Sequence, residues 1–204
     1  MEGIPSKIEE YIDSKREFYE LLLDFIENED ESPNSELINK LNVFKESVNI
    51  EDKMSIFHII LSICNNHQRT FNFKTKVHNL FKYLTNTLQQ TLKNLEMFDF
   101  FKSNKLILLY LIENQIITID DQIIKKIQNE TGYCYYFYSE ITQFLNEKEK
   151  EGIIKEMLQN DSNIFDEFEN KRQEGENESY ICSLIRKDDI SEFITYINQT
   201  NILL

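Results

Sequence analysis

The sequence predicts an all-α protein, built as a bundle of antiparallel helical hairpins with solenoid-like character and ending in a degenerate ankyrin-like helical pair. Gly occurs only 4 times and Pro twice in 204 residues, so positions that interrupt helices are few. Apolar residues recur at spacings of three and four along most of the chain, the period of an amphipathic helix. The one segment rich in strand-forming aromatics, 132–138, has no second strand to pair with, so we expect a loop or irregular helix there.

The first predicted helix starts at Pro5 and Ser6 and carries one apolar stripe. Lys15 is the only polar interruption of that stripe. The opposite face is densely acidic and runs into the acidic segment 27–31, which we interpret as a solvated outer face. The stripe itself follows the three-and-four spacing through Ile4, Ile8, Tyr11, Phe18, Leu22 and Phe25.

Three further helices follow a turn at Pro33 to Ser35. The apolar patterns predict a second helix over 37–48, a third over 54–64 that ends at residues 65–67, and a fourth over 73–92. Because the chain contains no Ala, these helices must pack against one another through large side chains.

The pattern in the middle of the chain predicts a buried helix, with N-cap residues at the starts of this helix and of the helices next to it. Asn94 and Ser103 are predicted as successive N-caps. Residues 106–112 are apolar on nearly every side, which predicts a central, buried helix. Thr118 and Asp121 resemble a capping box with a shortened acid, opening a helix that closes a second hairpin.

The C-terminal part is predicted to hold further helices over 146–159 and 163–172, followed by a helical pair. We therefore expect a helical domain over 1–172 and a hairpin over 173–204, packed on the first domain or beginning a repeat array. In that pair a polar turn at 187–189 separates two apolar patterns, made by Ile181, Leu184 and Ile185 and by Ile190, Phe193, Ile194 and Ile197.

The order of cap, short helix, polar turn and longer helix resembles an ankyrin repeat. The usual Thr-Pro-Leu-His opening is replaced by Ser179 to Cys182, and Asp188 stands where a Gly is expected, so the resemblance is to a degenerate or capping unit. The pattern by itself equally fits any helical hairpin.

Residues 101–120 and 175–198 are similar to segments of a large family of trichomonad-type protist ankyrin-repeat proteins. The resemblance covers roughly residues 8 to 204. It implies an N-terminal helical region that leads into a repeat array beyond Leu204 and that recognises other proteins. It implies no catalytic residue.

The charge is strongly acidic and unevenly distributed. The formal net charge is −14, and residues 1–36 hold 12 acidic against 3 basic side chains. Residues 54–95 contain no acid and five basic side chains. An acidic chain is poorly suited to nucleic acid, because neutralisation of phosphates dominates that affinity.

The basic stretch 69–93 carries the alternative function, an anion-binding module for RNA, acidic lipid or acidic protein. Its candidate binding residues are Arg69, Lys74, Lys76 and Lys82. The competing interpretation is an exposed polar face that complements the acidic first helix within the same molecule.

Cysteine usage and hydropathy predict a cytoplasmic protein. The three Cys are widely spaced, unlike a disulfide framework, and the N-terminus alternates in charge, unlike a secretory signal. The longest apolar run, 106–112, is far shorter than the roughly 20 residues that span a bilayer.

Catalytic, cofactor and metal motifs are not found in the sequence. Cys64 and His67 have the spacing of one pair of zinc ligands, but His58 and His78 do not form a second pair. The four Gly build neither a nucleophile elbow nor a phosphate-binding loop. We therefore expect a non-enzymatic protein–protein interaction module, a scaffold, cap or adaptor, without a cofactor or metal and with other proteins as partners.

Overall fold

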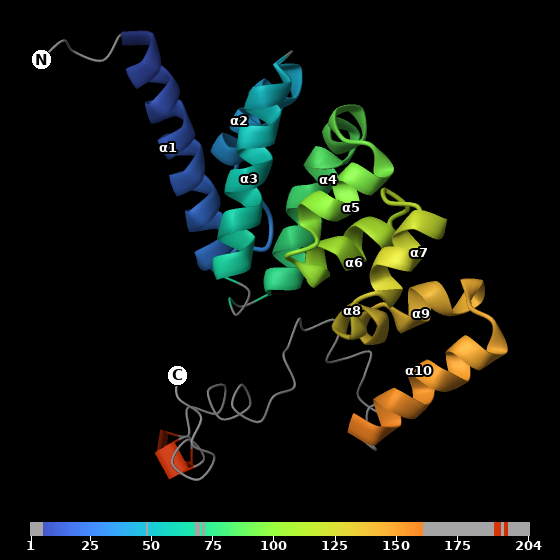
Figure 1. Cartoon of the computed structure of the whole chain (residues 1–204). Helices are drawn as coiled ribbons and strands as arrows, with labels where there is room; N and C mark the ends of the chain where they lie inside the picture. Colours follow the sequence, from blue (N-terminus) through green and yellow to red (C-terminus); the bar gives the residue numbers. More distant parts are fainter. Residues whose placement is uncertain are drawn as a thin grey trace, which may run out of the picture. The chain divides into compact units, whose positions relative to one another are not determined.

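The computed structural model describes residues 6–47, 49–67, 70, 72–160, 190–192 and 194–195. All regular secondary structure in these ranges is helical, which confirms the predicted all-α class (Figure 1). The chain divides into two compact units, residues 1–155 and 156–204. The sequence-based boundary after residue 172 lies outside the described residues, and the hairpin and solenoid details stay predictions.

The first four helices form the main bundle of the first unit. They are α1 (Ser6–Glu27), α2 (Ser35–Glu46), α3 (Ile50–Asn66) and α4 (Phe73–Thr91), and each of them contacts the other three. Side-chain caps fix two of the starts, because Asn34 accepts a hydrogen bond from the N–H of Leu37 and Asn49 from that of Glu51.

Large apolar side chains fill the space between these four helices. Phe57 packs edge-on against Phe44, with 5.6 Å between ring centroids. Burying each such side chain contributes about 1.5–3 kcal/mol to the free energy of folding. Further fully covered residues from all four helices are Leu22, Phe25, Ile26, Leu37, Leu41, Ile60, Val77, Leu80 and Leu84.

Helices α5 (Asn94–Phe101), α6 (Lys105–Glu113) and α7 (Asp121–Gln128) continue the chain. α6 contacts α4 and α5, and α7 contacts α5. Every residue from Leu106 to Ile112 is buried, which confirms the prediction of a central helix.

The caps of these helices differ from the predicted ones. Asn104, not Ser103, is the N-cap of α6, since its side-chain oxygen accepts from the N–H of Ile107 at 3.0 Å. Asn104 can do more than a serine hydroxyl, because its amide also donates to Asn65 of α3 at 2.9 Å. The prediction was wrong because two capping residues stand side by side and the local sequence does not decide between them. Ser103 accepts a hydrogen bond from the Asn65 side chain instead, at 3.1 Å.

Asn94 and Thr118 have a different role from the predicted one. Asn94 is the first residue of α5, whose N-cap is Lys93. Its amide oxygen accepts from the N–H of Thr118, and its amide nitrogen donates to the carbonyl of Thr118. The N-cap of α7 is Asp120, which accepts from two backbone N–H groups. Asn94 therefore joins the start of α5 to the loop before α7.

The remaining described helices are short, apart from the last. They are α8 (Thr131–Tyr136), α9 (Tyr138–Ile141), the 3-10 turn η1 (Thr142–Phe144) and α10 (Glu147–Asn160). The aromatic segment 132–138 is thus irregular helix, as expected. In the second unit, residues 190–192 and 194–195 are helical. The rest of the predicted ankyrin-like pair, and the predicted helix 163–172, lie outside the described residues.

Candidate functional site

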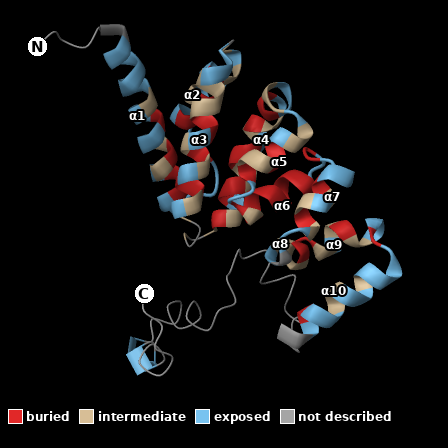
Figure 2. Cartoon of the chain, in the orientation of Figure 1, coloured by how far each residue is buried: buried red, intermediate tan, exposed pale blue. Residues whose placement is uncertain are grey.

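The N-terminal half of α1 extends its apolar face beyond the helices that cover its C-terminal half. Phe18, Leu22 and Phe25 of the predicted stripe are buried, as expected. Ile8 and Tyr11, earlier on the same stripe, are 49% and 48% exposed. Figure 2 shows this change from exposed to buried residues along α1. Within the described residues of the first unit, Ile8 and Tyr11 of the stripe are therefore left about half exposed.

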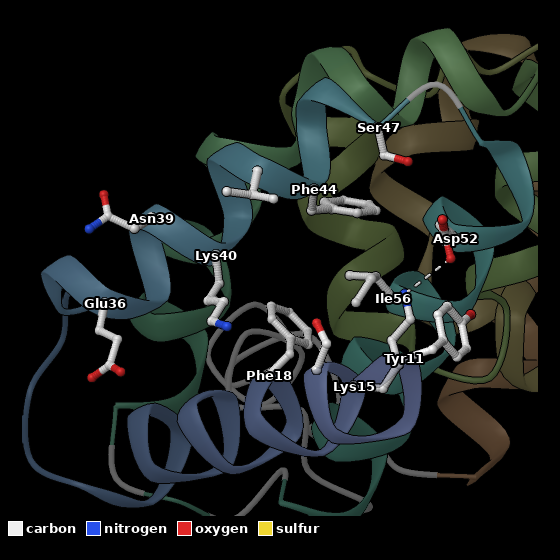
Figure 3. Close-up of a pocket in the computed structure, with 12 residues that line it drawn as sticks. Tyr11, Lys15, Phe18, Glu36, Asn39, Lys40, Phe44, Ser47, Asp52 and Ile56 are labelled. Atoms are coloured by element: carbon white, nitrogen blue, oxygen red, sulfur yellow. Dashed lines mark ion pairs between the residues drawn. The ribbon is translucent and has the colours of Figure 1, made fainter. Parts of the chain in front are cut away.

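A groove lies beside this uncovered face, between α1, α2 and the start of α3. Its cavity volume is about 440 Å³, within the range of about 300–1,000 Å³ that is usual for binding pockets. Phe18, Phe44 and Ile56, one from each helix, form an apolar floor (Figure 3). Tyr11 and Val43 line its edges, and Val43 is 70% exposed.

Two lysines line the groove, and both are held in ion pairs. Lys15 lies 3.6 Å from Asp52 of α3, drawn as a dashed line in Figure 3, and its ammonium stands 5.0 Å from the centre of the Tyr11 ring. Lys40 of α2 is paired with Glu17 of α1. The pairs connect α1 to α3 and α2 and leave the apolar side chains as the main contact surface of the groove.

Sequence reasoning did not find this groove, although one signal pointed to it. Lys15 interrupts an otherwise apolar stripe, and the structure places that lysine at the wall of the groove. Lys15 stands between the half-exposed residues Ile8 and Tyr11 and the buried residue Phe18. The periodicity alone does not say whether another element covers that part of the face.

The four candidate anion-binding residues do not form one exposed basic face. Arg69 lies outside the described residues. Lys74 is half-buried and Lys82 is exposed, both on α4. Lys76, between them, is fully buried. The prediction that Lys76 presents its charge to an external anion was therefore wrong.

Lys76 instead binds the C-terminal end of α1. Its ammonium donates hydrogen bonds to the backbone carbonyl of Ile26, at 2.8 Å, and to that of Asn28. A helix end leaves carbonyl groups without intrahelical partners, and their partial negative charge favours a cation. Burial lowers the pKa of Lys76, whereas the carboxylates of Asp30 and Glu31 raise it. The contact differs from the competing interpretation of an exposed polar face, because Lys76 is buried and binds backbone carbonyls of the α1 end, not acidic side chains.

Cys64, His58 and His78 pack against other side chains in the first unit, whereas His67 lies 3.3 Å from the carboxylate of Glu27. Burial raises the pKa of the Cys64 thiol to about 12. The rings of His58 and His78 lie against Phe100 and Tyr110, with centroid distances of 4.7 and 4.5 Å. Among the described residues, no group of three or more His, Cys, Asp or Glu side chains is arranged to hold a metal ion.

A second cavity, of about 400 Å³, lies between the end of α6 and the α9–η1 segment. Ile112, Ile117 and Phe144 contribute apolar surface, and Glu113 and Glu140 contribute carboxylates. Only the first groove adjoins a helix face that continues uncovered beyond it, so we take the first groove as the candidate site.

Within the described ranges, no helix combines the length and the apolar character needed to cross a membrane. Comparison with known proteins gives no match to any family model, curated protein or solved structure. The resemblance to protist ankyrin-repeat proteins thus stays a prediction from the sequence.

Proposed function

We propose that this chain is a non-enzymatic protein-binding module, a scaffold, cap or adaptor, that binds another protein through the groove between α1, α2 and α3. One observation carries the proposal: the apolar face of α1 continues past its own core onto an exposed surface at Ile8 and Tyr11. Exposed apolar surface that adjoins a groove is typical of interaction sites.

The chemistry of the groove supports binding over catalysis. Its lysines are neutralised by Asp52 and Glu17, which leaves them poorly suited to act as a nucleophile or a proton acceptor. The groove offers aromatic and aliphatic side chains at its floor and edges, the kind of surface that the core of a protein interface uses.

The ankyrin-repeat context and the cytoplasmic location belong to the same proposal. The family resemblance of residues 101–120 and 175–198 supports a place at the N-terminus of an ankyrin-repeat protein. Cys64 is a free, buried thiol, which fits a reducing compartment. The burial of Lys76 inside the bundle argues against the anion-binding alternative, because its ammonium cannot reach an external anion.

A site-specific photo-cross-linking experiment tests the proposal. A photoreactive amino acid is placed at Val43, at the edge of the groove, and in a control protein at Phe144, which is also exposed but lies at the second cavity. We expect one protein to be cross-linked from Val43 and not from Phe144 in extracts of the source organism. That protein, once purified, must also bind the wild-type chain more tightly than a Tyr11→Ala variant.

Two results would contradict the proposal. Equal cross-linking from both positions would mean that the groove has no preference for a partner. Cross-links from Val43 only to other residues of the same polypeptide would mean that the chain covers its own groove.

A further inference from the structure

The walls of the groove decide which backbone conformation a ligand can adopt there. α1 and α2 form its two sides, and the backbone N–H and C=O groups inside a helix are already hydrogen-bonded within that helix. An extended peptide would bury its own backbone groups without partners. A helix brings its backbone hydrogen bonds with it and presents only side chains, so the groove suits a helix laid in it.

The spacing of the groove residues supports the same choice. On α1 the lining residues Tyr11, Lys15 and Phe18 follow helical spacing, and on α2 Lys40, Val43 and Phe44 do so. Two rows of side chains with an apolar floor between them accept apolar residues that recur every three or four positions on a third helix.

The charge around the groove favours a ligand of positive charge. Residues 6–66, which contain all three groove helices, carry 14 acidic and 6 basic side chains, a net charge of −8. Both lysines that line the groove are already paired with acids. Glu36 lines one end of the groove and Glu10 is exposed next to Tyr11. A field of this sign accelerates the approach of a cationic partner and repels an anionic one.

Tyr11 adds a specific contact for a cation. Its ring already has the ammonium of Lys15 at 5.0 Å, and it remains 48% exposed. An exposed aromatic ring of this kind attracts a Lys or Arg side chain by a cation–π interaction.

From these contacts we infer that the ligand of the α1–α2–α3 groove is a cationic amphipathic helix of a partner protein, with apolar residues at helical spacing and Lys or Arg on their flanks. The inference rests on the proposed function. A second copy of this chain is a poor occupant, because its net charge of −14 would be repelled. An anionic lipid surface is disfavoured for the same reason.

A displayed peptide library tests the inference. Its members have about 14 residues, roughly four helical turns, with apolar residues fixed at positions i, i+3, i+4 and i+7 and with random flanking positions. The full chain selects binders, and a Val43→Arg variant removes peptides that bind elsewhere. We expect the selected flanks to be enriched in Lys and Arg. Enrichment in Asp and Glu, or no change in the charge of the flanks, would overturn the inference.

One selected peptide is then measured by fluorescence anisotropy. We expect Tyr11→Ala and Val43→Arg each to weaken binding about tenfold or more, because the first removes an aromatic contact and the second places a charge on an apolar edge of the groove. Glu36→Lys should weaken it by a smaller factor that disappears at high salt. Phe144→Arg and Glu113→Lys are the matched apolar and charge controls, on exposed positions outside the groove, and should leave the affinity unchanged. Equal losses with the controls would refute binding in the groove.

The outcomes separate the two proposals. A partner cross-linked specifically from Val43, together with a library that yields no cationic binder, would leave the proposed function standing and overturn the inference about the ligand. A failure of the cross-linking experiment overturns both. A dimer that dissociates in the Val43→Arg variant, measured by sedimentation, would assign the groove to a second copy and also overturn the cationic-helix inference.

Discussion

Replacing Lys76 by Met tests the role of the buried ammonium at the end of α1. The substitution keeps most of the apolar stem of the side chain and removes the charge and the hydrogen-bond donors. The carbonyl of Ile26 then loses a partner in a buried environment, and the carbonyl of Asn28 loses a partner at a partly buried position.

The expected loss follows from opposing contributions. A buried acceptor left without a donor costs about 1–3 kcal/mol, and the cation at a helix C-terminus contributes about 0.3–1 kcal/mol more. Removing the buried charge offsets part of this loss of stability, because folding no longer requires the ammonium to be desolvated. We expect Lys76→Met to lower the free energy of unfolding by about 2 kcal/mol, a fall in Tm of about 4–8 °C for a chain of this size.

Urea unfolding followed by circular dichroism measures the effect. The matched control is Lys82→Met, which removes an exposed lysine from the same helix and should change the stability by no more than about 0.5 kcal/mol. If the two variants were equally stable, the ammonium would contribute nothing at the helix end and the reasoning would be refuted.

The pH dependence provides an independent check on Lys76. Because burial lowers its pKa in the folded protein below 10.5, the folded state releases this proton at a lower pH than the unfolded state does. As pH rises towards 10.5, the wild type should therefore gain stability relative to Lys76→Met. A constant difference between the two proteins from neutral pH to pH 10.5 would contradict the lowered pKa.

Three further predictions concern the first unit. Gln115→Gly should raise the free energy of unfolding by about 0.5–1 kcal/mol in urea titrations, since Gln115 has a φ of 57°, a left-handed conformation that glycine adopts without strain; an unchanged stability would contradict this. Cys64, in a variant whose other cysteines are serine, should react with a thiol reagent only after unfolding, because the thiol is buried. The free energy of unfolding should fall as pH rises above 9, because the folded thiol stays protonated to about pH 12 while the unfolded one ionises. Burial, and then the charges of Lys74 and Lys82, lower the pKa of His78, so an NMR titration should give a pKa below 6.5. Lys82→Met should shift this pKa upwards. The free energy of unfolding should decrease as pH drops through 6.5, because the unfolded state is protonated first.

The helices themselves were predictable from the sequence because their apolar spacing is regular. The pattern after Pro5 predicts α1, and the structure begins that helix at Ser6. The uniformly apolar run 106–112 predicts the central helix for the same reason, since only burial on every side accommodates it.

The positions of the caps depend on tertiary contacts that a local pattern does not contain. Ser103 and Asn104 are both good N-cap residues and both hydrogen-bond Asn65 of α3, but it is Asn104 that accepts from a backbone N–H of α6. The burial of Lys76 was missed for a related reason. Its charge predicts a surface position, whereas the partner that retains it inside the bundle is a helix end 48–50 residues earlier in the chain.

The groove could not be predicted from the sequence, because apolar periodicity describes one helix at a time and does not show how helices pack. The stripe on α1 runs from Ile8 to Phe25 with Lys15 as its one polar interruption, yet its first residues are about half exposed and its last ones are buried. Lys15 marks the transition, and its ion pair with Asp52 of α3 can be recognised only once the two helices are placed side by side.

The contact between Lys76 and the end of α1 has a geometric consequence for the groove at the other end of that helix. α1 behaves as a stiff rod, and Tyr11 lies 15 residues from Ile26, about 22 Å at the helical rise of about 1.5 Å per residue. A rotation of about 5° about the Lys76 attachment would displace Tyr11 by about 2 Å, enough to admit or exclude a side chain. Lys76 thus holds the C-terminal end of the helix whose N-terminal half lines the groove.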